Sequence, residues 1–153
     1  YGYASKEVFK NANYILIEHP VNQKECISFM ERFVGTLGFK SVKIMSPQAH
    51  DEIISFTSQL PHAIAVSLIN SDNEKYETGK YIGDSYRDLT RIANINENLW
   101  SELFLRNSDY LLASIEAFEE QLDLIKVALK DNDERLLKDL FIKSSLRREK
   151  LEK

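Results

Sequence analysis

The pattern of hydrophobic and polar positions along the chain changes near residue 45. Before that point, residues 14–17 are a short apolar run that predicts a strand, and residues 39–45 are a second strand candidate. Between them, we expect Asn22, three positions before Glu25, to start a helix that ends at Gly38. The apolar residues at helical spacing in this stretch, which we expect to face the core, are Cys26, Phe29, Met30, Phe33 and Leu37. A strand, a helix and a strand form a βαβ unit, so two parallel strands at the edge of a larger sheet are predicted.

After residue 45 every segment has a helical pattern. Ser46 followed by Pro47 is a favourable helix start, and the helix is predicted to run to about residue 70. Pro61 lies inside it and removes one backbone hydrogen bond, so we expect a kink there. Further helices are predicted at residues 84–94, at 96–106, from Ser108 to about 130 and from about 134 onward, with a polar loop at 72–83 and a break at 131–133.

The long helix after Ser108 carries a heptad pattern. Its apolar residues are spaced 4, 3, 4, 3 and 4 positions apart, at Leu111, Ile115, Phe118, Leu122, Ile125 and Leu129. A period of 3.5 is typical of a helix packed lengthwise on a partner helix. The spacing leaves two interpretations open: a subunit interface, or a hairpin with the final helix. In that final helix, the residues expected to point inward are Leu136, Leu137, Leu140 and Phe141.

Composition narrows the class of protein. The chain has 153 residues, 43% of them hydrophobic and 29% charged, which suits a folded domain. Its net charge is −4 and residues 61–120 carry five basic against eleven acidic side chains, so a nucleic-acid partner is not expected. The single cysteine, Cys26, fits a reducing compartment, and no apolar run is long enough to span a bilayer. We therefore expect a cytoplasmic protein without a membrane partner.

The helix predicted at 46–70 carries the first candidate site. At about 100° per residue, Asp51, Ser55, Ser58 and His62 fall on one face of an ideal helix. Histidine is the side chain whose charge is most easily tuned near neutral pH, so a polar file ending in His62 is a candidate ligand site. The alternative is a packing face lined with hydroxyls that contains one hydrogen-bonded core histidine.

The next helix carries a second candidate, Arg87 and Arg91. Like charges four residues apart oppose helix formation unless an anion offsets them. Asp84 and Asp88 are close enough in sequence to do so, which is one interpretation. In the other, the two guanidinium groups bind carboxylates of a ligand, which they match in a bidentate geometry.

Several other chemistries are not expected. The chain has neither GxGxxG nor GxxxxGK[ST], so it has no recognisable nucleotide phosphate loop. The histidines His19, His50 and His62 lack the spacing of a zinc site, and no metal is expected. Cys26 and Trp100 are interpreted as core residues.

Two segments resemble the C-terminal region of prephenate dehydrogenases. Residues 50–68 read HDEIISFTSQLPHAIAVSL, where the family has HD, a spacer and SHLPHxxA. Residues 83–107 read GDSYRDLTRIANINENLWSELFLRN, where the family has GxGF[RK]DxTRIA, a spacer and a Met-Trp or Leu-Trp pair. Gln59 stands in place of the first histidine of SHLPH, Asp84 and Ser85 in place of glycines, and Glu97 in place of a proline. The positions of Ser58, His62, Arg87 and Arg91 match the pattern.

The resemblance implies a fold and a division into domains. We expect a mainly α chain in which residues 1–45 are the C-terminal edge of a nucleotide-binding Rossmann domain. Residues 46–153 would be an all-helical dimerisation and substrate-binding domain, similar in fold to the C-terminal domain of 6-phosphogluconate dehydrogenase. With the family in view, the seam of the long helix is interpreted as an intersubunit contact, so a homodimer is expected.

The resemblance also implies an activity. The family oxidises and decarboxylates prephenate to 4-hydroxyphenylpyruvate in tyrosine biosynthesis, with NAD or NADP held mainly by the N-terminal domain. The proton-accepting histidine is expected upstream of Tyr1, so this chain would contain no catalytic residue and be inactive alone. Ser58, His62, Arg87 and Arg91 would bind the substrate, with Arg91 clamping its side-chain carboxylate and His62 and Ser58 orienting it. Tyrosine, as a feedback inhibitor, is a further expected ligand of the same site.

Two alternatives stay open. The substrate could be arogenate, another cyclohexadienyl acid, which carries an amino group where prephenate has a keto group. The chain could also be a helical ligand-sensing or interaction module without chemistry. No residue of the sequence decides between NAD and NADP, since the residues that read the ribose are not present.

Overall fold

The computed structural model describes residues 5–151 and divides the chain into two compact units. One unit ends at Ala93 and the other begins at Asn94. The first unit contains a small sheet followed by helices, and the second is helical, so the predicted mainly α fold with a βαβ start is confirmed. No helix in residues 5–151 combines the length and the apolar content that crossing a membrane requires.

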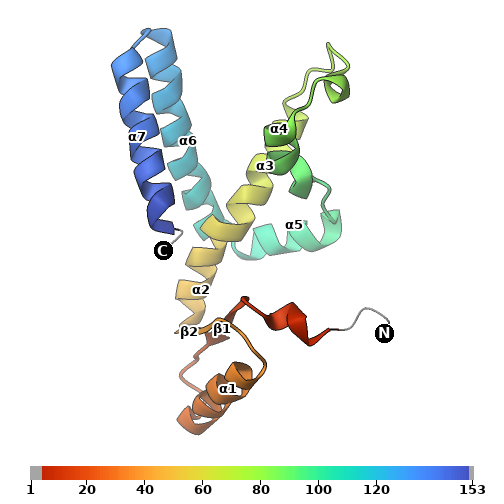
Figure 1. The fold of residues 1–153 in the computed structure, drawn as a ribbon, viewed down its shortest axis with the longest axis vertical. Helices are drawn as coiled ribbons and strands as arrows, with labels where there is room; N and C mark the ends of the chain where they lie inside the picture. The colour runs from red at the N-terminus through yellow and green to blue at the C-terminus, as the bar shows by residue number, and fades with distance from the viewer. Residues whose placement is uncertain (1–4, 152–153) are drawn as a thin grey trace. The chain divides into compact units, whose positions relative to one another are not determined.

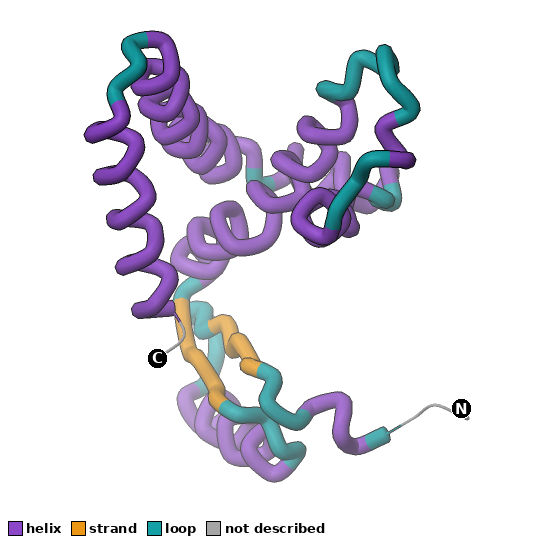
Figure 2. The backbone as a smooth tube through the Cα atoms, turned by 45° about the horizontal axis from the view of Figure 1, so that its top comes forward, coloured by secondary structure: helices purple, strands orange, loops and turns teal. Residues whose placement is uncertain are grey.

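The first unit opens with the predicted βαβ unit. After a 3-10 turn at Lys6–Phe9, strand β1 (Asn13–Ile17) pairs in parallel with strand β2 (Ser41–Met45). Helix α1 (Lys24–Thr36) connects the strands and packs against both of them, as Figure 2 shows. Val34, at 1% exposure, is the residue of α1 that is buried.

The inward stripe predicted for α1 is wrong in part. Cys26 is exposed rather than buried, and Phe29 and Phe33 are 58% and 47% exposed, although their rings stack with centroids 6.1 Å apart. On a helix these three lie about 80° to 140° around from the face on which Val34 packs. Because the sheet has two strands, it covers one side of α1 and leaves the aromatic stripe outside it.

The two ends of α1 differ in how well the sequence predicted them. The helix starts at Lys24 rather than at Asn22, whose side-chain oxygen instead accepts the backbone N–H of His19 at 2.7 Å. At the other end Gly38 has φ +90°, the left-handed conformation that glycine adopts at low cost. The predicted C-cap glycine is therefore confirmed.

The helix predicted at 46–70 is present as one run of helical backbone in three parts. The Ser46 hydroxyl caps its first turn by accepting the backbone N–H of Ala49 at 3.1 Å, and Pro47 occupies the first helical position. Both features follow the prediction. The three parts are α2 (Pro47–Ile54), a π-turn (Ser55–Gln59) and α3 (Leu60–Asn70).

The rest of the first unit folds back onto α3. The polar loop that follows α3 contains a 3-10 turn, Thr78–Lys80. Helix α4 (Asp84–Thr90) then leads into the 3-10 turn η4 (Arg91–Ala93), and both pack against α3 (Figure 1). The predicted helix at 84–94 is thus tighter in its last turn.

The second unit consists of helices α5 (Glu97–Arg106), α6 (Ser108–Lys130) and α7 (Glu134–Leu151). The Asn96 side chain caps α5, and Trp100 and Phe104 on it meet edge to face at 5.8 Å. Figure 1 shows α6 and α7 side by side, so the predicted hairpin with the final helix is present in the chain.

The hairpin nevertheless leaves three of the six seam residues exposed. Leu111 is 4% exposed, but Phe118, Leu122 and Leu129 are 36%, 46% and 64% exposed. Helix α7 instead covers the neighbouring face of α6, where Ala128 is fully buried. In α7 the prediction that Phe141 points inward is wrong, since this ring is 57% exposed.

Candidate functional site

The π-turn that joins α2 to α3 is the central feature of the candidate site. Its backbone stays helical, with φ and ψ of −57° and −47° at Leu60, but the Leu60 N–H bonds the carbonyl of Ser55, five residues back. Pro61 explains the wider turn. A proline ring inside an α-helix clashes with the carbonyl four residues earlier, here that of Thr57, and an extra residue in the turn moves that carbonyl away.

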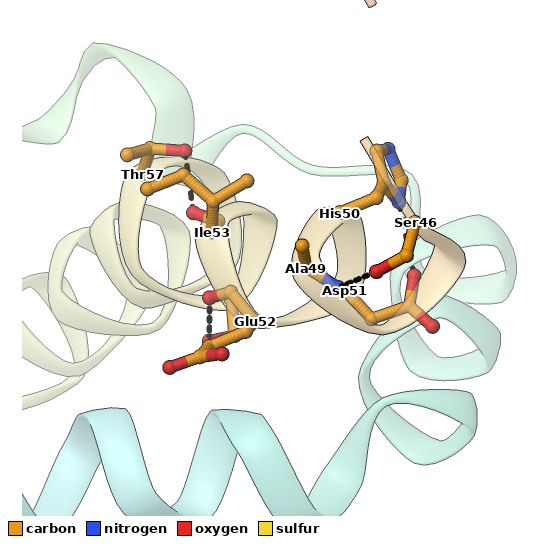
Figure 3. A network of polar contacts seen from close by, with 8 residues as sticks. Ser46, Ala49, His50, Asp51, Glu52, Ile53 and Thr57 are labelled. Atoms are coloured by element: carbon orange, nitrogen blue, oxygen red, sulfur yellow. Dashed lines mark hydrogen bonds and ion pairs between the residues drawn. The ribbon is translucent and has the colours of Figure 1, made fainter. Parts of the chain in front are cut away.

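Two hydroxyl groups hydrogen-bond backbone carbonyls where the π-turn begins. The Ser55 Oγ donates to the Glu52 carbonyl at 2.7 Å, and the Thr57 Oγ1 donates to the Ile53 carbonyl at 2.7 Å (Figure 3). Ser55 is 1% exposed, so its hydroxyl lies in the interior with a partner. A change of helical geometry weakens the regular bonds of these carbonyls, and the hydroxyls offset that loss.

His62 contacts the same turn through its ring. Its Nδ1 lies 2.8 Å from the carbonyl oxygen of Ser58, and both residues are half-buried. A carbonyl oxygen only accepts hydrogen bonds, so Nδ1 is the nitrogen that carries the hydrogen. The predicted site residues Ser58 and His62 are therefore brought together, through a backbone oxygen.

The other two members of the predicted polar file are in different surroundings. Ser55 is buried, whereas the exposed Asp51 has its Oδ1 2.9 Å from the Nδ1 of His50. The π-turn adds a residue between Asp51 and His62, so the helical phase that would align all four is lost. Gln59, where the resembling family has a histidine, is 5% exposed and belongs to the interior of the turn.

Arg87 and Arg91 lie on the segment that packs against α3. Arg87 is on α4, with its Nη2 3.5 Å from the Ile82 carbonyl, and Arg91 is the first residue of η4. Both side chains are exposed. Within residues 5–151, neither guanidinium lies within 4.0 Å of a carboxylate, so the local pairing with Asp84 and Asp88 is absent.

This arrangement can bind an anion that also carries a polar group. Two positive charges without a carboxylate partner are donors suited to carboxylates. The helix on which α4 and η4 pack carries a histidine whose ring is oriented by the backbone. These side chains can position a ligand. They do not include a nucleophile with an adjacent base.

The described residues do not provide a metal or nucleotide centre. Residues 5–151 contain no cluster of three or more His, Cys, Asp or Glu side chains that could hold a metal ion. A dinucleotide needs a glycine-rich turn after a parallel strand. The turn after β1 reads EHPVNQ and has no glycine.

Three comparisons connect the chain to known proteins. The family model described as the dimerization domain of prephenate dehydrogenase matches residues 46–143, which is more than half of the chain. The chain is 29% identical to the prephenate dehydrogenase of Bacillus subtilis over 135 residues, and 27% identical to the cyclohexadienyl dehydrogenase of Zymomonas mobilis over 143 residues. These matches cover 85% and 90% of this chain but 36% and 48% of the relatives, so the chain spans less than half of their length.

Solved structures have the same fold. The prephenate dehydrogenase of Aquifex aeolicus, crystallised with hydroxyphenyl propionate and NAD+, aligns with a TM-score of 0.82 and 28% identity. That alignment covers 97% of this chain and 53% of the crystallised one. The arogenate dehydrogenase of Synechocystis aligns with a TM-score of 0.83 over 95% of this chain and 54% of that one, and at 22% identity this likeness concerns the fold alone.

Proposed function

Because the chain belongs to the family of prephenate dehydrogenase dimerization domains, we propose that it is the substrate-positioning and subunit-pairing part of such an enzyme. The complete enzyme would oxidise and decarboxylate prephenate, or the related arogenate, with a nicotinamide dinucleotide as oxidant. The relatives that match most of this chain bear the names of prephenate and cyclohexadienyl dehydrogenases, which supports this reaction class.

The pair Arg87 and Arg91 is the observation that carries the proposal. Prephenate has two carboxylates. Each is best bound by hydrogen-bond donors that are not already paired with a carboxylate of the protein itself. In residues 5–151 these two guanidinium groups have no carboxylate partner, and their segment packs against the helix that carries His62. Arg91 would clamp the side-chain carboxylate, Arg87 would add a second positive charge, and Ser58 and His62 would orient the ring.

The cofactor, NAD or NADP, would be held mainly outside this chain. The two strands β1 and β2 offer no glycine-rich turn for its phosphates, so the residues present do not fit the dinucleotide. We therefore propose that the proton-accepting histidine and the hydride transfer belong to the part of a nucleotide-binding domain upstream of Tyr1, and that this domain ends near residue 45. The family model begins at residue 46, which supports a domain boundary there.

A homodimer follows from the same family and from α6. Phe118, Leu122 and Leu129 are large apolar side chains on one helix face that the hairpin with α7 leaves exposed. Burying such a face against a second copy removes it from water. Tyrosine, which shares the carboxylate and the aromatic ring of the product, is a further ligand that the same site would accept.

The test is turnover by the complete protein, with the reading frame extended upstream of Tyr1. Nucleotide reduction would be followed with prephenate and, in parallel, with arogenate. Turnover of either substrate is expected and would name the preferred one. If a folded protein that includes its nucleotide-binding domain reduces neither NAD nor NADP with either substrate, the proposal is wrong and a non-catalytic ligand-sensing module takes its place.

A further inference from the structure

We infer that Pro61 and the π-turn form a positioning device that fixes the neutral ring of His62 in one tautomer, with the hydrogen on Nδ1 and Nε2 as a hydrogen-bond acceptor. The inference about the tautomer depends on the geometry of the helix alone. Its consequence for ligand recognition rests on the proposed function.

The device begins with the proline. Pro61 has no backbone N–H and its ring excludes the carbonyl of Thr57 from the usual α-helical position, so the turn widens until Leu60 bonds Ser55. Widening changes the direction of the carbonyls within the π-turn. One of them, that of Ser58, receives the ring of His62 at 2.8 Å from its Nδ1.

The acceptor character of that oxygen decides the tautomer. Because a carbonyl cannot donate, the contact exists with the hydrogen on Nδ1, and in the neutral ring Nε2 then carries a lone pair. Whatever Nε2 touches, in the protein or in a ligand, must therefore be a donor.

The other two histidines provide internal references. At His19 the roles are reversed, because the Val21 N–H points to its Nδ1 at 3.3 Å and makes that nitrogen the acceptor. The Nδ1 of His50 lies 2.9 Å from a carboxylate oxygen of Asp51, which can only accept from a neutral ring. The three contacts predict the hydrogen on Nε2 in His19 and on Nδ1 in His50 and His62.

The tautomer of His62 implies that His62 and the two arginines bind different groups of a ligand. Arg87 and Arg91 are donors only and suit the carboxylates of a ligand. A neutral His62 with an acceptor at Nε2 repels a carboxylate oxygen and binds a donor such as a hydroxyl or an ammonium group. We thus infer that His62 reads a donor group on the ligand and leaves the carboxylates to the arginines.

The first test measures the tautomers directly. Long-range proton–nitrogen correlation spectra of the chain with labelled histidine, recorded at a pH where all three rings are neutral, distinguish the two nitrogens of each ring. Single His→Asn variants assign the three signals. We expect Nδ1–H for His62 and His50 and Nε2–H for His19. A dominant Nε2–H signal from His62 would overturn the inference.

The Pro61→Ala variant tests whether the proline acts through the ring. It restores a backbone N–H, so the turn can close to an ordinary α-helix, in which the Ser58 carbonyl takes a different direction relative to the ring of His62. The expected result is loss of the dominant Nδ1–H signal from His62, with those of His19 and His50 unchanged. An unchanged His62 signal in a folded variant contradicts the role of the proline, and if the variant does not fold, the wild-type tautomer remains the deciding measurement.

The second test asks which ligand group His62 reads. Titration calorimetry on the complete protein would compare 3-phenylpropionate, 3-(4-hydroxyphenyl)propionate, phenylalanine and tyrosine, which share a carboxylate and differ in hydroxyl and ammonium donors. Each would be measured with the wild type, His62→Ala and the control His19→Ala. We expect one donor to improve wild-type binding by about three- to ten-fold and this gain to vanish in His62→Ala alone.

The outcomes separate cleanly. Coupling between His62 and the hydroxyl, or between His62 and the ammonium group, identifies the donor that is read. Rescue of the coupling by His62→Gln, whose amide oxygen also accepts, supports the acceptor role. Absence of coupling to either donor overturns it. Failure of all four ligands to bind the wild type instead contradicts the proposed function and leaves the tautomer result standing.

Discussion

Arg91 lies at the junction where α4 tightens into η4, and its guanidinium has no carboxylate partner within residues 5–151. We expect Arg91→Ala in the complete protein to raise the KM for the cyclohexadienyl substrate by about 10- to 100-fold, because a charge-assisted bond contributes about 1.5–3 kcal/mol. Nucleotide affinity should stay nearly unchanged, and steady-state kinetics with each substrate varied in turn measures both effects. Arg106→Ala, which removes an exposed arginine paired with Glu102, is the matched control. Equal loss of substrate and nucleotide affinity in Arg91→Ala would contradict the clamp.

Asp72, in the loop after α3, is an exposed carboxyl whose pKa is lowered by two neighbouring hydrogen-bond donors. A side-chain hydrogen bond from Thr78, followed by the backbone N–H of Glu74 at 3.0 Å, lowers the pKa of Asp72 below its ordinary value of 3.8. A depressed pKa means that the loop gains stability above the unfolded pKa and loses it as the pH falls through the folded one. Thr78→Val should raise the pKa of Asp72 toward its ordinary value, which carboxyl carbon NMR would follow. An unchanged titration would show that the backbone N–H alone holds the carboxylate.

At the scale of single elements, helix α1 contains one glycine and is followed by another, and substitutions at the two have opposite expected effects. Gly38 has φ +90°, so Gly38→Ala forces an L side chain into the left-handed region and should cost about 1 kcal/mol of the free energy of unfolding. Gly35 lies inside α1 with ordinary dihedral angles, and a Cβ added there meets nothing within 4 Å. Gly35→Ala should therefore stabilise by up to about 1 kcal/mol. Urea unfolding of both variants measures the pair, and a shift of the same sign in both would contradict this account.

The elements also show where sequence reasoning succeeded. The Ser46 cap, the Gly38 terminus and the helices that follow were predicted by local rules, because each depends on neighbours within a few residues. The parallel pairing of β1 and β2 joins residues far apart in the chain, and it was predicted from the order strand, helix, strand. The π-turn was not predicted. Pro61 indicated that the helix would be distorted, but the form of the distortion depends on how neighbouring hydroxyls hydrogen-bond the displaced carbonyls. The burial of Cys26 and of Phe29 was predicted wrongly, since helical spacing says which residues share a face and not how wide the opposing sheet is.

The candidate site was predicted to a similar extent. The motif match selected Ser58, His62, Arg87 and Arg91. The packing of α4 and η4 on α3 places the elements of the two arginines beside the helix that carries His62. The absence of internal partners for the arginines in residues 5–151 could not be read from sequence, because Asp84 and Asp88 are at suitable spacings. The substrate roles of the four residues stay predictions that the experiments above test.

At the scale of the whole molecule, the exposed seam of α6 leads to a prediction about assembly. Light scattering should report a mass near twice 17.7 kDa, because a dimer interface would bury Phe118, Leu122 and Leu129. Leu122→Glu puts a charge in the middle of that face and should shift the mass toward the monomer at micromolar concentration.

Ala113→Glu is the matched control for this variant. Ala113 is exposed on the same helix, on the side opposite the seam, so the same new charge there should leave the dimer intact. A wild-type chain that stays monomeric at high concentration would contradict the interface. Equal dissociation by both variants would show that the effect is one of charge and not of the seam.

The π-turn has a final consequence for anyone who wishes to transplant the site. A designer who copied Ser58 and His62 onto a regular helix at their four-residue spacing would reproduce the letters of the motif but not its geometry. The portable unit is the whole stretch from Glu52 to His62, including the buried hydroxyl of Ser55 and the proline. The unit to transplant is therefore a helical segment whose π-turn contains one residue more than a regular α-helical turn. Removing that extra residue would rotate the histidine to a different face of the host helix.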